Sequence, residues 1–198
     1  MSIVKRLSGL VMAVIAAITF CSCDKEGTET GSASGIVGTW RITHFEYSFN
    51  DKITGTETAT EIEAYHFGED GHLTYLTDDF TLPIPYSYSP KNKTLTMTMF
   101  GAYAIFLVKK LTSTELVFTT YGFNGEDSES IDYGKNLKYV DSYKGFKIYE
   151  YDDDCFCYRN KGEMVPCAKL YIEDIDGNFS GDIEGYYDRI TAYLKRVK

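Results

Sequence analysis

Apolar and polar residues alternate with a period of two along most of the chain from Ile36 onward. The clearest example is TLTMTMF, residues 94–100, in which Leu95, Met97 and Met99 share one face and threonines occupy the other. Turn signals recur about every eight to twelve residues, and short alternating strands at that spacing are typical of a β-sandwich or barrel. The pattern therefore predicts an all-β fold.

Three pairs of these strands are joined by short polar turns, so each pair is predicted to form a β-hairpin. The pairs are residues 61–67 with 72–77, residues 85–89 with 94–100, and residues 103–110 with 115–121. Because hairpins that follow one another place their strands side by side, we expect an antiparallel up-and-down arrangement.

The single tryptophan, Trp40, stands in GTWRITHFEYSF, residues 38–49. Trp40 and Ile42 have one parity and Phe45 has the other, so the alternation slips near Thr43. A slip of one residue indicates a β-bulge, which bends a strand sharply.

Residues 1–22 precede this pattern and read as an export signal. Lys5 and Arg6 are followed by an apolar run over residues 7–20, which is too short to span a bilayer comfortably. The small residue Ser22 stands before Cys23. This segment resembles the lipobox of bacterial lipoproteins, which implies cleavage before Cys23, lipidation of Cys23 and anchoring in the outer membrane of a Gram-negative bacterium. A plain secretory signal and an uncleaved anchor helix are the alternatives.

Residues 23–35 form a polar, Gly/Ser/Thr-rich stretch that we interpret as a flexible linker. Asp24, Lys25 and Glu26 follow the lipidated position directly. Acidic residues there resemble a surface-export signal of one Gram-negative branch, whereas Asp after the Cys resembles an inner-membrane retention signal of enteric bacteria. The sequence therefore leaves open whether the protein faces the periplasm or the cell surface.

The chain is acidic, with a formal net charge of −9, and loss of residues 1–22 makes it more negative because they hold Lys5, Arg6 and no acid. This charge disfavours nucleic acid as a partner and argues against peripheral binding to anionic lipid. On this view, the acyl chains alone hold the protein at the membrane.

The Gly38-x-Trp40 motif at a bent first strand resembles the lipocalin pattern. Further matching points are Tyr65-x-Phe67-x-x-x-Gly71, the turn and strand over residues 91–95, and residues 110–116. Together they resemble the lipocalin-like domain of small bacterial lipoproteins over about residues 36–122. The resemblance implies an antiparallel up-and-down β-barrel over residues 36–198, with residues 123–187 as an insertion or extension.

In lipocalins the tryptophan closes the barrel and stacks on an arginine of the last strand. The resemblance therefore implies that Arg196 contacts Trp40, with Arg189 as the second candidate. It also implies that Gly38, which has no side chain, lets the chain pass close to its neighbours as it enters the barrel. Residues 190–197 are interpreted as the closing strand. A C-terminal amphipathic helix is the alternative, because apolar residues also recur there at helical spacing.

Three cysteines, Cys155, Cys157 and Cys167, lie in DDCFCYRNKGEMVPC. Because an exported protein meets an oxidising compartment, we expect Cys167 in a disulfide, with Cys157 slightly favoured over Cys155 as its partner. Three free thiols are the alternative. A metal site lacks a fourth ligand, since no histidine lies near in sequence.

The remaining chemistry-bearing residues favour a non-catalytic protein without a cofactor or metal. Residues 152–154 and 174–178 are acidic but fail the EF-hand template, so solvated loops are favoured over a calcium site. No nucleophile motif is present. His44, His66 and His72 read as strand residues, although His44 and His66 could share one interior.

The leading hypothesis is a binding protein that holds a small apolar or amphipathic ligand inside the barrel. Interior lining would come from Leu95, Met97, Met99, Ile105 and Leu107, with Tyr86, Tyr88 and Tyr103 at the mouth. The alternative is an envelope interaction module that binds glycan or protein through exposed aromatics over a filled core. A cavity of ligand size separates the two hypotheses.

Overall fold

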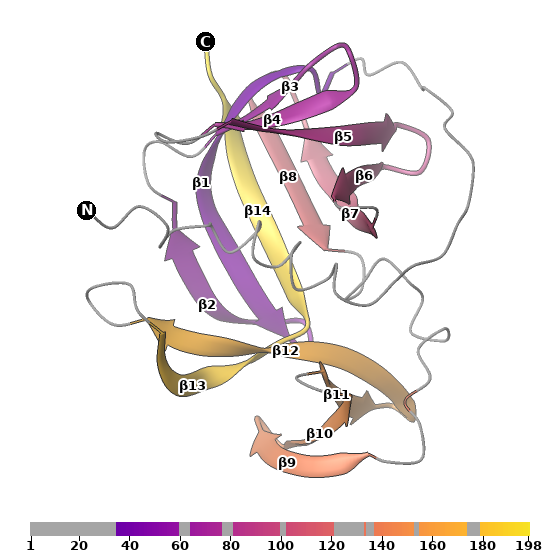
Figure 1. Cartoon of the computed structure of the whole chain (residues 1–198), viewed down its shortest axis with the longest axis vertical. Coiled ribbons are helices and arrows are strands. Elements are labelled where there is room, and N and C mark those ends of the chain that lie inside the picture. The colour runs from indigo at the N-terminus through magenta and orange to yellow at the C-terminus, as the bar shows by residue number, and fades with distance from the viewer. Residues whose placement is uncertain are drawn as a thin grey trace.

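The computed structural model describes residues 35–59, 64–76, 81–99, 102–120, 133, 137–152, 155–173 and 179–198. The regular elements of this part of the chain are all β-strands, so the predicted all-β class is confirmed. They form two sheets, which lie one above the other in Figure 1.

The larger sheet closes into an antiparallel barrel of eight strands. Its strands follow one another around the barrel in the order β1, β3, β4, β5, β6, β7, β8 and β14, and β14 pairs again with β1. This closed antiparallel barrel is consistent with the lipocalin-like fold expected from the sequence. The strands are β1 (Gly38–Phe49), β3 (Ala64–Phe67), β4 (His72–Leu76), β5 (Thr81–Ser89), β6 (Thr94–Met99), β7 (Ala102–Leu111), β8 (Glu115–Thr120) and β14 (Arg189–Arg196).

Strand β1 is long enough to pair with two different strands along one of its edges. Residues 38–41 pair with β3, residues 44–49 pair with β2 (Lys52–Thr58), and the other side of β1 pairs with β14. The register against β14 shifts between Ile42 and His44, so the predicted bulge is confirmed. The bulged Thr43 donates its hydroxyl to the carbonyl of Tyr193 at 2.9 Å.

One end of the barrel is closed by the residues that enter β1 and leave β14, and we call it the closed end. Trp40 is fully buried, and the Cζ atom of Arg196 lies 4.2 Å from the centre of its ring. The Arg196 guanidinium also donates to the carbonyls of Val37 at 2.8 Å and Gly35 at 2.7 Å. The indole N–H of Trp40 donates to Ile36 at 2.7 Å. The expected contact between Trp40 and Arg196 is therefore confirmed, and residues 189–196 form a strand rather than a helix.

Position 38 at the closed end requires a glycine, both for its backbone conformation and for the space beside it. Its φ of 128° lies in the region that favours glycine. A Cβ atom at this position would meet Nη1 of Arg196, so glycine lets the guanidinium reach the entering chain.

The smaller sheet lies at the other end of the barrel, below β2 in Figure 1. Its strands run in the order β13, β12, β11, β10, β9 and form a small core of their own around Phe49, the last residue of β1. Ala168, Leu170 and Tyr187 pack instead against the barrel core. The strands are β9 (Lys138–Tyr143), β10 (Phe146–Asp152), β11 (Cys155–Asn160), β12 (Glu163–Glu173) and β13 (Phe179–Tyr187).

Replacement of Trp40 by alanine should lower the free energy of unfolding by about 3–5 kcal/mol, because it removes a fully buried indole and leaves a cavity. Urea unfolding monitored by circular dichroism measures this. Tyr103→Ala is the control, since Tyr103 is 47% exposed and its loss should cost less than about 1 kcal/mol. Equal effects of the two substitutions would contradict the closure role of Trp40.

Candidate functional site

The interior of the barrel is occupied by its own side chains. Trp40, Phe45, Phe67, Leu95 and Phe118 are each 0% exposed. Side chains that line a cavity wide enough for water keep accessible surface toward that cavity, and these side chains keep none. Around these five residues the described interior is therefore packed as in an ordinary protein core.

Aromatic rings supply much of this packing. The ring centres of Tyr65 and Tyr75 lie 5.2 Å apart, those of Phe67 and Tyr86 lie 5.0 Å apart, and those of Phe106 and Phe118 lie 5.3 Å apart. The last two pairs meet edge to face, an arrangement that adds about 0.5–1.5 kcal/mol per pair beyond burial.

The residues expected to line a ligand site divide between the two faces of the barrel wall. Leu95 and Met97 of β6 are buried and face inward, as predicted. Ile105 and Leu107 of β7 are paired with Thr96 and Thr94, so they lie on the outer face, and their predicted inward position is wrong. The side chain of Met99 lies outside the described residues.

The error on β7 has a physical cause. Residues 102–108, AYAIFLV, are apolar throughout, so no alternation fixes which parity faces inward. The pairing of Leu95 with Phe106 and of Met97 with Ala104 sets the phase, and Ala104, Phe106 and Val108 become the buried set.

The three tyrosines expected at a barrel mouth do not gather there. Tyr86 and Tyr88 are buried near the closed end, and Tyr86 donates its hydroxyl to the carbonyl of Gly68 at 2.8 Å. Burial raises the pKa of both tyrosines. Tyr103 is exposed on the outer face opposite Thr98. The three tyrosines therefore do not share one mouth of the barrel, because Tyr86 and Tyr88 lie near the closed end and Tyr103 lies at the start of β7.

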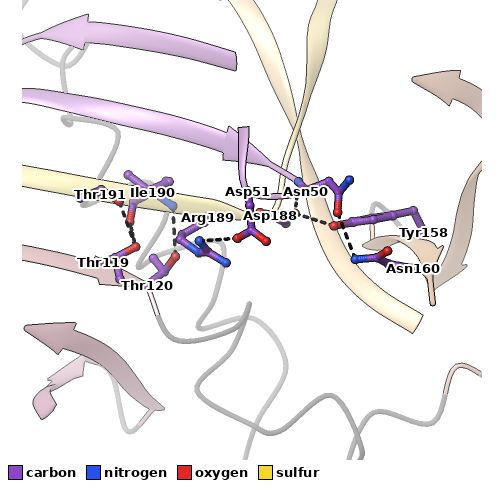
Figure 2. A network of polar contacts seen from close by, with 10 residues as sticks. All are labelled: Asn50, Asp51, Thr119, Thr120, Tyr158, Asn160, Asp188, Arg189, Ile190 and Thr191. Carbon is purple, nitrogen blue, oxygen red and sulfur yellow. Dashed lines mark hydrogen bonds and ion pairs between the residues drawn. The ribbon is translucent and has the colours of Figure 1, made fainter. Parts of the chain in front are cut away.

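A polar network joins the smaller sheet to the barrel (Figure 2). Asp188 is the single residue between β13 and β14, and its Oδ2 accepts from the backbone N–H of Asn50 at 2.7 Å and from the hydroxyl of Tyr158 at 2.6 Å. Asn160 donates to the side chain of Asn50 at 3.0 Å. Burial, followed by the bond to Asp188, raises the pKa of Tyr158, so its hydroxyl stays a neutral donor.

The sequence signal for this junction is the Asn50-Asp51 turn between β1 and β2. Both residues have positive φ, 49° and 62°, as the two-residue turn of a tight hairpin requires, and Asn and Asp tolerate that conformation. Asp51 also pairs with Arg189 at 2.9 Å. The network therefore anchors the smaller sheet from the turn of one barrel strand and the start of another, a contact that sequence reasoning missed.

The structure contradicts the predicted disulfide. None of Cys155, Cys157 and Cys167 is in a disulfide. Cys167 pairs across the sheet with Phe156, whereas Cys157 pairs with Pro166, so the thiols of Cys157 and Cys167 point to opposite faces. Burial raises the pKa of Cys157 to about 12 and also raises the pKa of Cys167. Both thiols are therefore protonated and weak as nucleophiles or metal ligands.

Four tyrosines lie on the Cys157 side of the smaller sheet, and we call them the tyrosine face. Tyr149 pairs with both Tyr139 and Cys157, and the rings of Tyr139 and Tyr149 lie 6.3 Å apart. Tyr133 and Tyr151 meet edge to face at 5.1 Å. Tyr139 is 54% exposed and the other three are half-buried. Sequence analysis cannot separate these four from the remaining tyrosines, because only the register brings them together.

The three histidines do not form a site together. The ring of His44 stacks on Tyr193 at 4.3 Å, His66 contacts the hydroxyl of Thr39 at 2.9 Å, and His72 lies 3.5 Å from Asp70. The described residues contain no group of three or more His, Cys, Asp or Glu side chains placed to hold a metal ion. Residues 174–178 lie outside the described part of the chain.

Among the residues that the structure describes, no helix has the length and apolar character to cross a membrane.

Comparison with known proteins identified no relative of this chain: no family model matches it, and no curated protein matches it. The class is therefore defined by the fold alone, a closed antiparallel β-barrel extended by a second sheet, and such barrels are compatible with ligand binding.

Iodoacetamide should alkylate all three of Cys155, Cys157 and Cys167 in unfolded protein without any reductant, because none of the three is in a disulfide. In the folded protein Cys155 should react first, at least about tenfold faster, since it is half-buried while Cys157 and Cys167 are buried. Peptide mass spectrometry gives both results. If Cys167 were labelled only after a reductant is added, the disulfide predicted from the sequence would be supported and the free-thiol structure contradicted.

Proposed function

We propose that this chain is an exported, lipid-anchored, non-catalytic protein of a Gram-negative outer membrane that binds glycan or protein through its tyrosine face. The observation that supports the proposal is the burial of the described barrel core, in which Trp40, Phe45 and Phe118 keep no accessible surface toward an internal ligand. Recognition is then left to surface groups.

The tyrosine face has the chemistry of a recognition surface. A tyrosine ring offers apolar area for stacking, and its hydroxyl tolerates water, so tyrosine is enriched where proteins meet partners. Tyr139 is the most exposed of the four rings, at 54%, so it is the part of the face that a partner would meet first. Aromatic rings that carry hydroxyl groups suit a partner that is itself part polar, such as a sugar chain.

A second candidate keeps the ligand inside the barrel. Tyr65 and Tyr75 are buried within the largely apolar barrel core, and Tyr47, also in that core, donates its hydroxyl to Glu57 of β2 at 2.6 Å. A few polar groups in apolar surroundings are the usual composition of a small-molecule site. An amphipathic ligand would then enter by displacing side chains at the end opposite the closed end.

The double substitution Tyr139→Ala with Tyr149→Ala should weaken binding to a glycan array, or to a cross-linked envelope protein, by at least about tenfold. The reason is that it removes one pair of rings from the tyrosine face without touching the barrel core. Tyr103→Ala is the matched control, because Tyr103 is an exposed tyrosine on the barrel wall.

Native mass spectrometry of protein taken from its own membrane distinguishes the two candidates. A small apolar molecule that copurifies equally with the wild type and the double variant would support the barrel site and contradict the tyrosine face. Binding that is lost in the double variant and kept in Tyr103→Ala would support the tyrosine face.

For the anchor, Cys23→Ala should abolish fatty-acid labelling and release the protein from membranes, whereas Cys21→Ala should change neither. The reason is that Cys23 follows the small residue Ser22 and Cys21 follows the bulky Phe20. Metabolic labelling and membrane fractionation measure both effects. Labelling that persists in Cys23→Ala would contradict the anchor.

A further inference from the structure

The chain enters the barrel at the closed end, and this fixes which end lies nearest a lipid anchor. Arg196 holds the carbonyl of Gly35 at 2.7 Å, so residue 35 is tied to the closed end. A polar linker of about twelve residues has an average end-to-end distance of about 20 Å. An anchor at Cys23 therefore keeps the closed end, rather than the smaller sheet, close to the bilayer.

The closed end is basic although the whole chain is acidic. Five exposed lysines lie at the ends of its strands or in the turns between them: Lys91, Lys93, Lys109, Lys110 and Lys195. We call them the lysine rim. The backbone N–H of Val108 donates to the carbonyl of Lys93 at 2.7 Å, which places the β5–β6 turn beside the end of β7. Lys195 is the cross-strand partner of Glu115, whose carboxylate pairs with Lys110.

The nearby acidic groups do not cancel this charge. Glu115 is held by Lys110, and that contact, with a further contribution from Lys195, lowers its pKa. Asp70 and Glu69 lie in the β3–β4 turn, where the carboxylate of Asp70 accepts from the backbone N–H of His72 at 3.0 Å. The lysine rim therefore outnumbers the acids around it.

The β5–β6 turn, which carries Lys91 and Lys93, extends beyond the first residue of β4. His72, the first residue of β4, pairs with Pro85, and β5 continues beyond it to Ser89 before the turn begins. Four further residues at about 3.3 Å each carry Lys91 and Lys93 about 13 Å beyond the start of β4 along the strand. The acidic β3–β4 turn also extends past His72, and its Gly71 carbonyl accepts from the backbone N–H of Tyr86 at 2.8 Å, so this turn lies beside β5 before the lysine-bearing turn begins.

We propose that the lysine rim is a membrane-docking surface that binds the anionic headgroups of the leaflet in which the chain is anchored. The proposal rests on the lipid anchor proposed above and adds a second contact to it. Lysines near an anionic leaflet each strengthen binding about fivefold, and one acyl chain alone holds a protein only reversibly. A net charge of −9 argues against contact with an anionic membrane only if the charge is spread evenly over the surface, and here one end of the molecule is basic.

The test uses the chain from Asp24 onward, which keeps every described residue and carries no acyl chain. It should sediment with vesicles of phosphatidylcholine containing about 30% phosphatidylglycerol at low salt, and not with pure phosphatidylcholine vesicles. Lys91→Glu, Lys93→Glu and Lys109→Glu together should reduce this binding by at least about a hundredfold. Salt at about 0.5 M should abolish wild-type binding, because exposed charges are then screened.

The matched control is Lys52→Glu, Lys147→Glu and Lys161→Glu. These lysines are also exposed, lie away from the closed end, and give the same change in net charge. Lys161 matches Lys93, since their φ angles are 50° and 55°. The control should bind vesicles nearly as well as the wild type. Equal loss in both variants, or equal binding to the two kinds of vesicle, would overturn the proposal.

Two further results decide between related explanations. Release of the wild type from vesicles by inorganic phosphate below about 1 mM would reveal a discrete phosphate site and overturn a docking surface. Failure of the anchor is separate, because it is measured by fatty-acid labelling of Cys23 in cells. Vesicle binding by a chain without acyl groups does not depend on that labelling.

Discussion

The guanidinium of Arg196 contacts four residues of the segment that enters the barrel. It lies over the ring of Trp40 and donates to the carbonyls of Val37 and Gly35. It also leaves no room for a side chain at Gly38. It therefore joins the last strand both to the first strand and to the segment that leads into it. An open sheet exposes two unpaired edges, whereas this closure removes them from the barrel strands. The buried core that gives the barrel its stability is enclosed only when these two strands meet.

The same two strands also place the smaller sheet. Strand β1 begins with Trp40 in the barrel core and ends with Phe49 in the core of the smaller sheet. Strand β14 begins directly after Asp188, which binds Asn50 and Tyr158. The bulge at Thr43 keeps inward-facing residues on one side of β1 although their parity changes. Closure of the barrel and attachment of the smaller sheet are therefore coupled through one pair of strands.

The parts of the fold that could be predicted are those with a local signal. Alternation and short turns specify the hairpins, and the parity slip before Phe45 specifies the bulge. The resemblance to lipocalins supplied the contact between Trp40 and Arg196, which lie far apart in sequence. Register carries no such signal: it decided that Ile105 and Leu107 face outward, that Cys157 and Cys167 lie on opposite faces, and that four tyrosines share a surface.

Topology explains why the two ends of the molecule differ. Neighbouring strands of an antiparallel barrel run in opposite directions, so the start of β1 lies beside the end of β14 at the closed end. Strand β8 pairs with β14 and runs antiparallel to it, so β8 ends where β14 begins. Any segment inserted between β8 and β14 must then leave and return at the end opposite the entering chain. The smaller sheet is such an insertion, so it lies at the end of the barrel opposite residue 35, and the anchor proposed above would hold the chain from the other end.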